Sequence, residues 1–276
     1  MQRQGFPRGT SGAAVRQVAE DLVREAGAVA VERFTQGVEV TFKGWRNVVT
    51  ATDYEIDRLI TARLLEEFPG WGILSEESPP VDGGDSGLVW IVDPIDGTKN
   101  FSQGMPTFAV NLALVDRGTV VLALTYDPNR DELFLAERGA GASLNGKPMH
   151  VSSKTLVEEC LIGFDMGYDN ERAKQLLDFL GSLWPAMQGM RNIGSAALGL
   201  AYAASGRTDL YLHSVLSPWD FAPGLLLVQE AGGVATERDG SALTIGTHGI
   251  IAANPAVHAD LLRLATGNPW QRAGFD

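Results

Sequence analysis

Apolar residues recur at two different spacings along this chain, and each spacing predicts a different kind of element. Over residues 11–34 they return every three or four positions, which is typical of an amphipathic helix. A second helical face covers residues 56–64. Just before it, Thr52 and Glu55 have the spacing of a capping box. Asp53 is therefore expected at a helix start, where its charge would interact favourably with the helix dipole.

Short apolar segments separated by turn residues dominate the rest of the first half. Strands are predicted over residues 72–75, 88–92, 107–115, 120–126 and 132–137. Asn145-Gly146 marks a further tight turn, and residues 36–48 are expected to form a loop or short strands. The first half is therefore predicted to consist of helices packed on an antiparallel sheet.

The second half alternates between the two kinds of element. Its strands are predicted over residues 156–164, 187–191, 209–212 and 249–253. Its helices are predicted over residues 170–183, 194–205, 218–230 and 255–265. Such alternation favours a mainly parallel sheet flanked by helices. The prediction is an α/β fold with an α+β N-terminal half, in which two domains, residues 1–150 and 151–276, form a layered αβαβα sandwich.

Composition and charge narrow the classes of function. The 276 residues are 45% hydrophobic, enough for a sizeable core, and they carry 22 basic against 34 acidic side chains, a net charge of −12. Such a surface repels nucleic acid and anionic membranes, so neither is expected as a partner. It also disfavours a phosphorylated substrate unless a metal ion supplies local positive charge.

Cysteine usage and the chain start favour a cytoplasmic protein. The single cysteine, Cys160, lies in an apolar run and has no second cysteine for an internal disulfide, which suits a reducing cytosol. The first ten residues are expected to form a loose polar tail without the apolar segment of a secretory signal. No stretch approaches the roughly 18 uninterrupted apolar residues of a membrane span.

Two carboxylates come directly after the apolar run of residues 88–92. Asp93 and Asp96 stand three residues apart, and Gly97 and Thr98 follow them. Neighbouring carboxylates repel each other unless a cation lies between them, and oxygen ligands of this kind suit a hard ion such as Mg²⁺. The small residues offer backbone N–H groups to an anion, so the motif indicates metal and phosphate together. The alternative is plain turn chemistry, because Asp-Pro and Asp-Gly pairs are ordinary turn signals.

Two further acidic positions are candidates for the same site. Glu76 ends the apolar run of residues 72–75, and two strand ends that carry acids could meet at one sheet edge. By itself, however, the pair Glu76-Glu77 is typical of a solvated loop. Asp220 closes the sequence Ser217-Pro218-Trp219-Asp220, which by itself is typical of helix capping.

The string Trp-Ile-Val-Asp-Pro-Ile-Asp-Gly-Thr-Lys-Asn-Phe, ending at Phe101, resembles the signature of the inositol monophosphatase family. That family lies within a superfamily that includes fructose-1,6-bisphosphatases and lithium-sensitive nucleotide phosphatases. Trp219-Asp220-x-Ala-x-Gly, followed by Glu-Ala-Gly-Gly from Glu230, is similar to the second family signature. The two signatures stand in the expected order, and the resemblance covers nearly the whole chain from about residue 12 onward.

The resemblance implies a set of metal ligands. One Mg²⁺ would be held by Glu76, Asp93 and the backbone carbonyl of Ile95. A second Mg²⁺ would be held by Asp93, Asp96 and Asp220, so that Asp93 bridges both ions. The resemblance leaves the number of ions open between two and three, the third being a weaker ion near Glu76.

The resemblance also implies catalytic roles. Water activated by metal and oriented by Glu76 and Thr98 would attack phosphorus, and Asp53 would hold Thr98 in place. The backbone N–H groups of Gly97 and Thr98 would bind phosphate oxygens. Four histidines and one cysteine form no nucleophile pattern, so a phosphohistidine or cysteine phosphatase is disfavoured.

The identity of the substrate is less constrained. The resemblance favours inositol 1-phosphate, with Asp96 and Asp220 near the substrate and Gly194 and Ser195 at a helix start that contacts hydroxyls. His213 stands where animal enzymes have a glutamate that recognises inositol, and a structural loop histidine is the alternative there. Fructose 1,6-bisphosphate, NADP or other nucleotide phosphates and histidinol phosphate all stay open.

Three further expectations accompany the resemblance. Relatives are commonly homodimers, so the same assembly is expected here, and inhibition by Li⁺ is expected as well. A non-catalytic phosphate-binding protein is the competing class, and it would lack a metal ligand. All the carboxylates of the two signatures are present, which disfavours that class.

Overall fold

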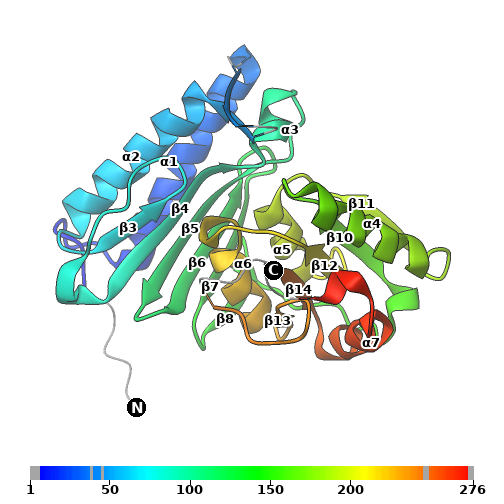
Figure 1. The fold of residues 1–276 in the computed structure, drawn as a ribbon. Helices are drawn as coiled ribbons and strands as arrows, with labels where there is room; N and C mark the ends of the chain where they lie inside the picture. Colours follow the sequence, from blue (N-terminus) through cyan, green and yellow to red (C-terminus); the bar gives the residue numbers. More distant parts are fainter. Residues whose placement is uncertain (1–6, 38–39, 45–46, 245–248, 273–276) are drawn as a thin grey trace.

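Two large β-sheets alternate with three layers of helices in the computed structural model (Figure 1), which describes residues 7–37, 40–44, 47–244 and 249–272. The layers are stacked as α-β-α-β-α, so the predicted fold class is confirmed. The first six residues of the expected tail lie outside the described residues. So do residues 38–39 and 45–46 of the segment expected to be a loop or short strands.

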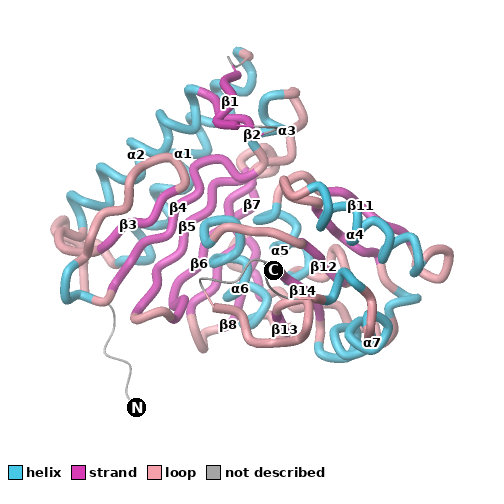
Figure 2. The backbone as a smooth tube through the Cα atoms, in the orientation of Figure 1, coloured by secondary structure: helices cyan, strands magenta, loops and turns pink. Residues whose placement is uncertain are grey.

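Two long helices form the first outer layer. They are α1 (Val15–Gln36) and α2 (Ala51–Glu67), and their apolar faces pack on one side of the first sheet. Between them, β1 (Val40–Gly44) and β2 (Asn47–Thr50) pair as an antiparallel hairpin. Figure 2 shows both helices lying along the strands of the large sheet.

The helix α2 starts two residues earlier than predicted. Its N-cap is Thr50 instead of Thr52, because β2 stays extended up to Thr50 and the helix follows at once. The Thr50 backbone N–H and hydroxyl donate to Oδ2 of Asp53 at 2.9 and 2.5 Å. The capping box is therefore real but uses Thr50 and Asp53. Asp53 keeps its predicted place in the first turn.

The first sheet has seven strands in the order β3-β4-β5-β6-β7-β8-β9. Its strands are β3 (Gly72–Ser75), β4 (Leu88–Asp96), β5 (Ala109–Asp116), β6 (Thr119–Asp127), β7 (Glu132–Glu137), β8 (Gly141–Leu144) and β9 (Lys147–Pro148). Only β3 and β4 run parallel, and the others form the predicted antiparallel meander. The short helix α3 (Thr98–Ser102) follows β4 directly.

Two buried helices fill the space between the sheets. They are α5 (Ala196–Ala204) and α6 (Pro218–Glu230), and both contribute to the apolar core that joins the two sheets. Glycines let them approach closely. A Cβ on Gly199 would lie 2.1 Å from the Tyr211 ring, and one on Gly224 would lie 2.4 Å from Leu200. These helices carry their N-termini, and the residues at them, to one edge of both sheets.

The second sheet has five strands in the order β11-β10-β12-β14-β13. Its strands are β10 (Leu161–Asp165), β11 (Gly189–Asn192), β12 (Leu210–His213), β13 (Val234–Thr236) and β14 (Ile250–Ala253). All run in one direction except β14, which is antiparallel to both of its neighbours, so a mainly parallel sheet is confirmed. Its outer face is covered by α4 (Asn170–Leu183) and α7 (Pro255–Ala265).

Two expectations for the second half need correction. The strand predicted over residues 156–164 begins only at Leu161, because Val157–Glu159 forms a 3₁₀ turn. The short strand β13 was not expected. The last strand of the large sheet ends at Pro148, and the first strand of the small sheet begins at Leu161. The division of the chain into two domains after residue 150 remains a prediction. Within the described ranges, no helix has both the length and the apolarity of a membrane span.

Candidate active site

A β-bulge in β4 turns Asp93 and Asp96 toward the same face of the sheet. Asp93 pairs with Asn111 and Asp96 pairs with Ala109, so three steps along β4 match two steps along β5. In a regular strand, residues three apart point to opposite faces, and the extra residue of a bulge reverses this. The intervening Pro94 suits a bulge because it has no N–H to donate. The strand thus continues past its predicted end at residue 92.

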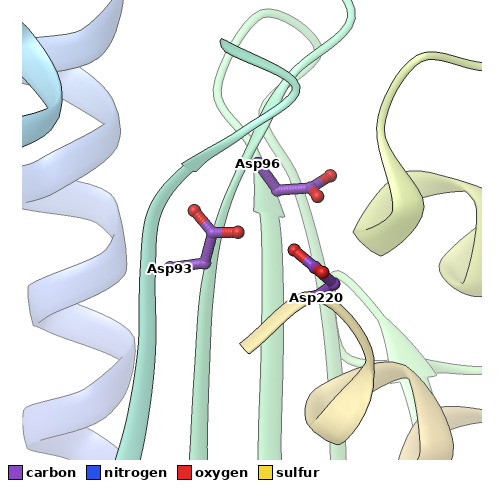
Figure 3. Close-up of side chains that lie close together, drawn as sticks. All are labelled: Asp93, Asp96 and Asp220. Atoms are coloured by element: carbon purple, nitrogen blue, oxygen red, sulfur yellow. The ribbon is translucent and has the colours of Figure 1, made fainter. Parts of the chain in front are cut away.

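The third carboxylate comes from the other half of the chain. Asp220 is in the first turn of α6, where the Ser217 backbone N–H donates to its Oδ2 at 2.6 Å. The helix-capping interpretation is therefore confirmed for this residue, and its role in the site stays a prediction. Asp93, Asp96 and Asp220 each place an oxygen within 4.8 Å of the others (Figure 3).

Burial and mutual repulsion make this cluster unfavourable without a cation. Burial raises the pKa of Asp93 well above its usual range, and the charges of Glu76, Asp96 and Asp220 raise it further. Burial and the charge of Asp96 likewise raise the pKa of Asp220. The pKa of Asp96 rises to about 6 through burial, although a hydrogen bond from Ser195 opposes the shift. A divalent cation would relieve this repulsion.

The donor set fits a hard divalent ion. All three side chains offer carboxylate oxygens, which Mg²⁺ prefers. The backbone between them is held in shape by its own hydrogen bonds. The Ile95 N–H donates to Oδ1 of Asp93 at 3.1 Å, and the Thr98 hydroxyl donates to the Ile95 carbonyl at 2.9 Å. That carbonyl retains a second lone pair.

Glu76 lies beside this cluster at the end of β3. Ser75 is in register with Val92, and the Glu76 N–H donates to the Val92 carbonyl at 3.2 Å, so Glu76 is next to Asp93 across the two strands. Its charge raises the pKa of both Asp93 and Asp220. Its carboxylate is not among the three that lie within 4.8 Å of one another.

A serine and an aspartate that the sequence did not single out hold the end of β3. The Ser75 hydroxyl donates to Asp57, which lies on α2 one turn after Asp53. Both partners are buried. This bond joins the end of β3, just before Glu76, to α2. The backbone at Glu76 is therefore held both by α2 and by the pairing of β3 with β4.

Thr98 and Asp53 are brought together across 45 residues of sequence. The Thr98 hydroxyl lies 3.1 Å from Oδ1 of Asp53, while Oδ2 of Asp53 is used by the helix cap. Burial raises the pKa of Asp53, and the hydrogen bonds from Thr50 and Thr98 oppose that shift. Gly97 precedes them with φ +95°. A Cβ there would lie 3.0 Å from the Thr107 carbonyl, so this position requires glycine.

The helix start at Gly194 and Ser195 holds a metal-ligand candidate. The Ser195 hydroxyl and the Ala197 N–H, the latter at 3.0 Å, both donate to Oδ2 of Asp96. Ser195 also accepts a bond from the Leu198 N–H as the N-cap of α5. Asp96 is thus fixed by the second half of the chain.

Asp165, at the end of β10, holds this helix start and was missed by the sequence analysis. Its Oδ1 accepts the Gly194 N–H at 2.6 Å and the Asn192 amide at 3.0 Å. Its Oδ2 accepts the Tyr211 hydroxyl at 2.9 Å. Burial raises the pKa of Asp165 to about 7. The available signal was an acid directly after an apolar strand, the same signal that singled out Asp93.

Asn111 links the two halves below the cluster and was also missed. It is fully buried and in register with Asp93. Its side-chain amide donates to the Trp219 carbonyl at 2.8 Å, and its oxygen accepts the Thr125 hydroxyl at 2.6 Å. The first turn of α6, and with it Asp220, is therefore tied to β5. A polar residue inside an apolar strand was the only sequence signal.

His213 is the last residue of β12 and is a neutral donor. Its ring is buried, and burial lowers its pKa to about 3. Its Nδ1 accepts the Val215 N–H at 3.1 Å, so the ring proton resides on Nε2. His213 can therefore donate to a ligand hydroxyl but offers no free acceptor nitrogen. This differs from the glutamate that the resemblance places at the same position.

Comparison with known proteins identifies the family. A model described as the inositol monophosphatase family matches residues 13–268. The chain belongs to the inositol monophosphatase family. The predicted class, a phosphoric monoester hydrolase, is thereby confirmed, and this family in general depends on Mg²⁺.

Individual relatives cover nearly the whole chain. An inositol-1-monophosphatase of Mesorhizobium japonicum is 37% identical over 91% of this chain and 92% of its own. The solved extragenic suppressor protein suhB of Bartonella henselae has a TM-score of 0.88 at 37% identity, covering 92% of this chain and 98% of its own. An IMPase/NADP phosphatase solved with Mg²⁺ and phosphate has a TM-score of 0.81 at 26% identity, covering 92% and 96%.

Proposed function

We propose that this chain is a Mg²⁺-dependent phosphatase that hydrolyses inositol 1-phosphate. The observation that carries the proposal is the convergence of Asp93, Asp96 and Asp220 at the bulge of β4, with oxygens within 4.8 Å of one another and pKa values raised by burial. A buried cluster of this kind is unfavourable in its fully ionised form at neutral pH, and a bound cation would compensate its charge.

The residues assigned to hold Mg²⁺ are those of the two signatures. Glu76, Asp93 and the carbonyl of Ile95 would hold one ion, and Asp93, Asp96 and Asp220 a second, with room for a third near Glu76. When bound, Mg²⁺ lowers the pKa of a coordinated water and neutralises phosphate oxygens.

The chain itself orients the reacting groups. The Thr98 hydroxyl, held between Asp53 and the Ile95 carbonyl, would orient the attacking water together with Glu76. Because Asp53 is anchored by the cap of α2, it restrains Thr98 without becoming a ligand. The N–H groups of Gly97 and Thr98 would receive phosphate oxygens, as backbone donors at a tight turn do.

The alcohol side of the substrate is assigned to the second half of the chain. The start of α5 at Gly194 and Ser195, the first turn of α6 at Asp220, and His213 would face the leaving alcohol. His213 would donate from Nε2 to a hydroxyl oxygen. Asp96 would lie between phosphate and alcohol because the α5 start holds it there.

The choice of inositol 1-phosphate is supported by the named relatives, several of which are inositol-1-monophosphatases. The alternatives are fructose 1,6-bisphosphate, NADP or another nucleotide phosphate, and histidinol phosphate. One structural neighbour is named for both inositol monophosphatase and NADP phosphatase activity. The complete carboxylate set disfavours a non-catalytic phosphate-binding protein. A homodimer, a cytoplasmic location and sensitivity to Li⁺ remain predictions.

The test is phosphate release from these four substrates in the presence of Mg²⁺. Inositol 1-phosphate is expected to have the highest kcat/KM. A higher kcat/KM on another of these substrates would support the phosphatase activity but show that inositol 1-phosphate is not its preferred substrate. No release from any phosphate monoester, with the protein folded and Mg²⁺ bound, would rule out the proposed function.

A further inference from the structure

A loop of the second half stands against His213 and carries an exposed aromatic ring. Gly167 follows β10 with φ +69°, and a Cβ on it would lie 3.1 Å from Cε1 of His213. The next residue, Tyr168, is 51% exposed. Its ring receives the ammonium group of Lys99, which lies 4.2 Å from the ring centroid. Since Lys99 directly follows Thr98, this contact joins the phosphate motif to the second half of the chain.

The charges of the carboxylate cluster act on the Tyr168 hydroxyl. Burial of the hydroxyl raises its pKa, and the charges of Glu76, Asp220, Asp96 and Asp93 raise it further. The phenol therefore keeps its proton at neutral pH and can donate a hydrogen bond. The ring thus holds Lys99 against its face and carries a hydrogen-bond donor at its end.

The groups along this side of the site share one chemical character. His213 offers an Nε2 proton, Tyr168 offers a phenolic proton, and Lys99 offers a positive charge. A neutral polyol is recognised well by carboxylates, which accept its hydroxyl protons. A wall of donors with a cation suits a ligand that carries negative charge, and charge-assisted hydrogen bonds to an anion are the stronger kind. Because the chain as a whole carries a net charge of −12 and repels anions, such a position would bind an anionic group that the rest of the surface disfavours.

We propose that Lys99, Tyr168 and His213 form a subsite for a second anionic group on the leaving alcohol, such as the second phosphate of a sugar bisphosphate. The subsite rests on the proposed phosphatase function and refines its substrate class. It predicts a preference for substrates that carry a second negative charge over otherwise identical monophosphates.

The test compares kcat/KM on fructose 1,6-bisphosphate and fructose 1-phosphate, which share the scissile ester and differ in the second phosphate. Wild type should favour the bisphosphate. Lys99→Met should reduce kcat/KM for the bisphosphate by about tenfold, mainly through KM, and change that for the monophosphate by less than about twofold. Lys99→Arg should retain the preference, since Arg also stacks on aromatic rings. Lys147→Met, at the far end of the large sheet, is the control for an equal loss of charge.

Variants of Tyr168 distinguish a specific subsite from a general effect of the Lys99 charge. Tyr168→Phe keeps the ring under Lys99 but removes the phenolic proton, so it should lose part of the preference. Tyr168→Leu also removes the ring and should lose most of it. If neither fructose ester is hydrolysed, the same comparison uses both as inhibitors of inositol 1-phosphate hydrolysis. An equal preference in wild type and Lys99→Met, with activity intact, would overturn the subsite. Loss of turnover on every substrate in wild type would instead refute the proposed function.

Discussion

The two sheets each carry a predicted site residue at the end of a strand, and the two ends differ in chemistry. β4 ends in Asp93 and Asp96, buried acids whose pKa values are raised. β12 ends in His213, a buried base whose pKa is lowered to about 3. A cation would relieve the repulsion between the acids at the end of β4, whereas the neutral histidine at the end of β12 needs no counter-charge.

This difference separates the phosphate side of the site from its alcohol side. The acids of β4 are held by several parts of the chain at once: the bulge, the start of α5 and the hydrogen bond from Ile95. Among the described residues, the His213 side chain accepts one hydrogen bond, from the Val215 N–H. Chemistry at the phosphate is therefore expected to tolerate little change, and recognition of the alcohol is expected to be adjustable.

Replacing Asp93 should have the largest effect on the phosphate side. Asp93→Asn removes the carboxylate assigned to bridge two cations, so kcat/KM should fall by at least about a thousandfold, on the order of 4 kcal/mol of transition-state stabilisation. Because burial and repulsion raise the pKa of Asp93, the same variant should be more stable to heat than wild type without metal. Activity assays and thermal unfolding with and without Mg²⁺ check both statements.

The matched control for that variant is Asp127→Asn. Asp127 is a fully buried carboxylate at the end of β6, where it pairs with Arg130 at 2.7 Å. This variant should lose stability and keep most of its activity. Near-normal turnover by Asp93→Asn would show that the ligand assignment is wrong.

Removing the Thr98 hydroxyl should have the next largest effect. Thr98→Ala takes away the group held between Asp53 and the Ile95 carbonyl, so kcat should drop by roughly a hundredfold while Mg²⁺ affinity changes little. Thr61→Ala, whose hydroxyl bonds only within α2, is the control. Measuring the rate over a Mg²⁺ titration gives the maximal kcat and the Mg²⁺ affinity separately. A loss of Mg²⁺ affinity without a loss of maximal kcat would contradict an orienting role for Thr98.

The raised pKa of Asp165 predicts how the free energy of unfolding depends on pH. Its folded pKa of about 7 lies above the unfolded value near 3.9, so the folded state binds the extra proton between these values. Its contribution to stability is complete below about pH 4 and is lost as the pH rises through 7, by on the order of 1.4 kcal/mol per unit of pKa shift. The gain in stability from Asp165→Asn should therefore be larger at pH 8 than at pH 5. Denaturant unfolding at both values measures it, and an identical pH profile would contradict the assigned pKa.

The smallest effect is expected on the alcohol side. His213→Glu restores an acceptor in place of a donor, so the ratio of kcat/KM on inositol 1-phosphate to that on fructose 1,6-bisphosphate should rise by about two- to tenfold. Mg²⁺ dependence should not change, since His213 is not a ligand candidate. An unchanged ratio would mean that His213 is a structural residue of the strand end.

The sequence predicted the layers and the acidic cluster because both depend on local patterns. Alternating apolar runs define the sheets, and acids after such runs mark Asp93 and Glu76. The bulge that turns Asp96 toward Asp93 depends on register with β5, which Pro94 alone does not specify. Asp165 and Asn111 act through partners far away in the sequence, so their roles emerge only from the folded chain.

Mg²⁺ dependence of phosphate release tests the central claim most directly. Wild type is assayed on inositol 1-phosphate after exhaustive removal of divalent metal, then during Mg²⁺ titration, in parallel with Asp93→Asn. The account predicts no turnover without metal, full recovery in wild type on adding Mg²⁺, and no recovery in the variant. Full turnover by metal-free wild type, or equal recovery by both proteins, would contradict the assignment of Asp93, Asp96 and Asp220 as a magnesium site.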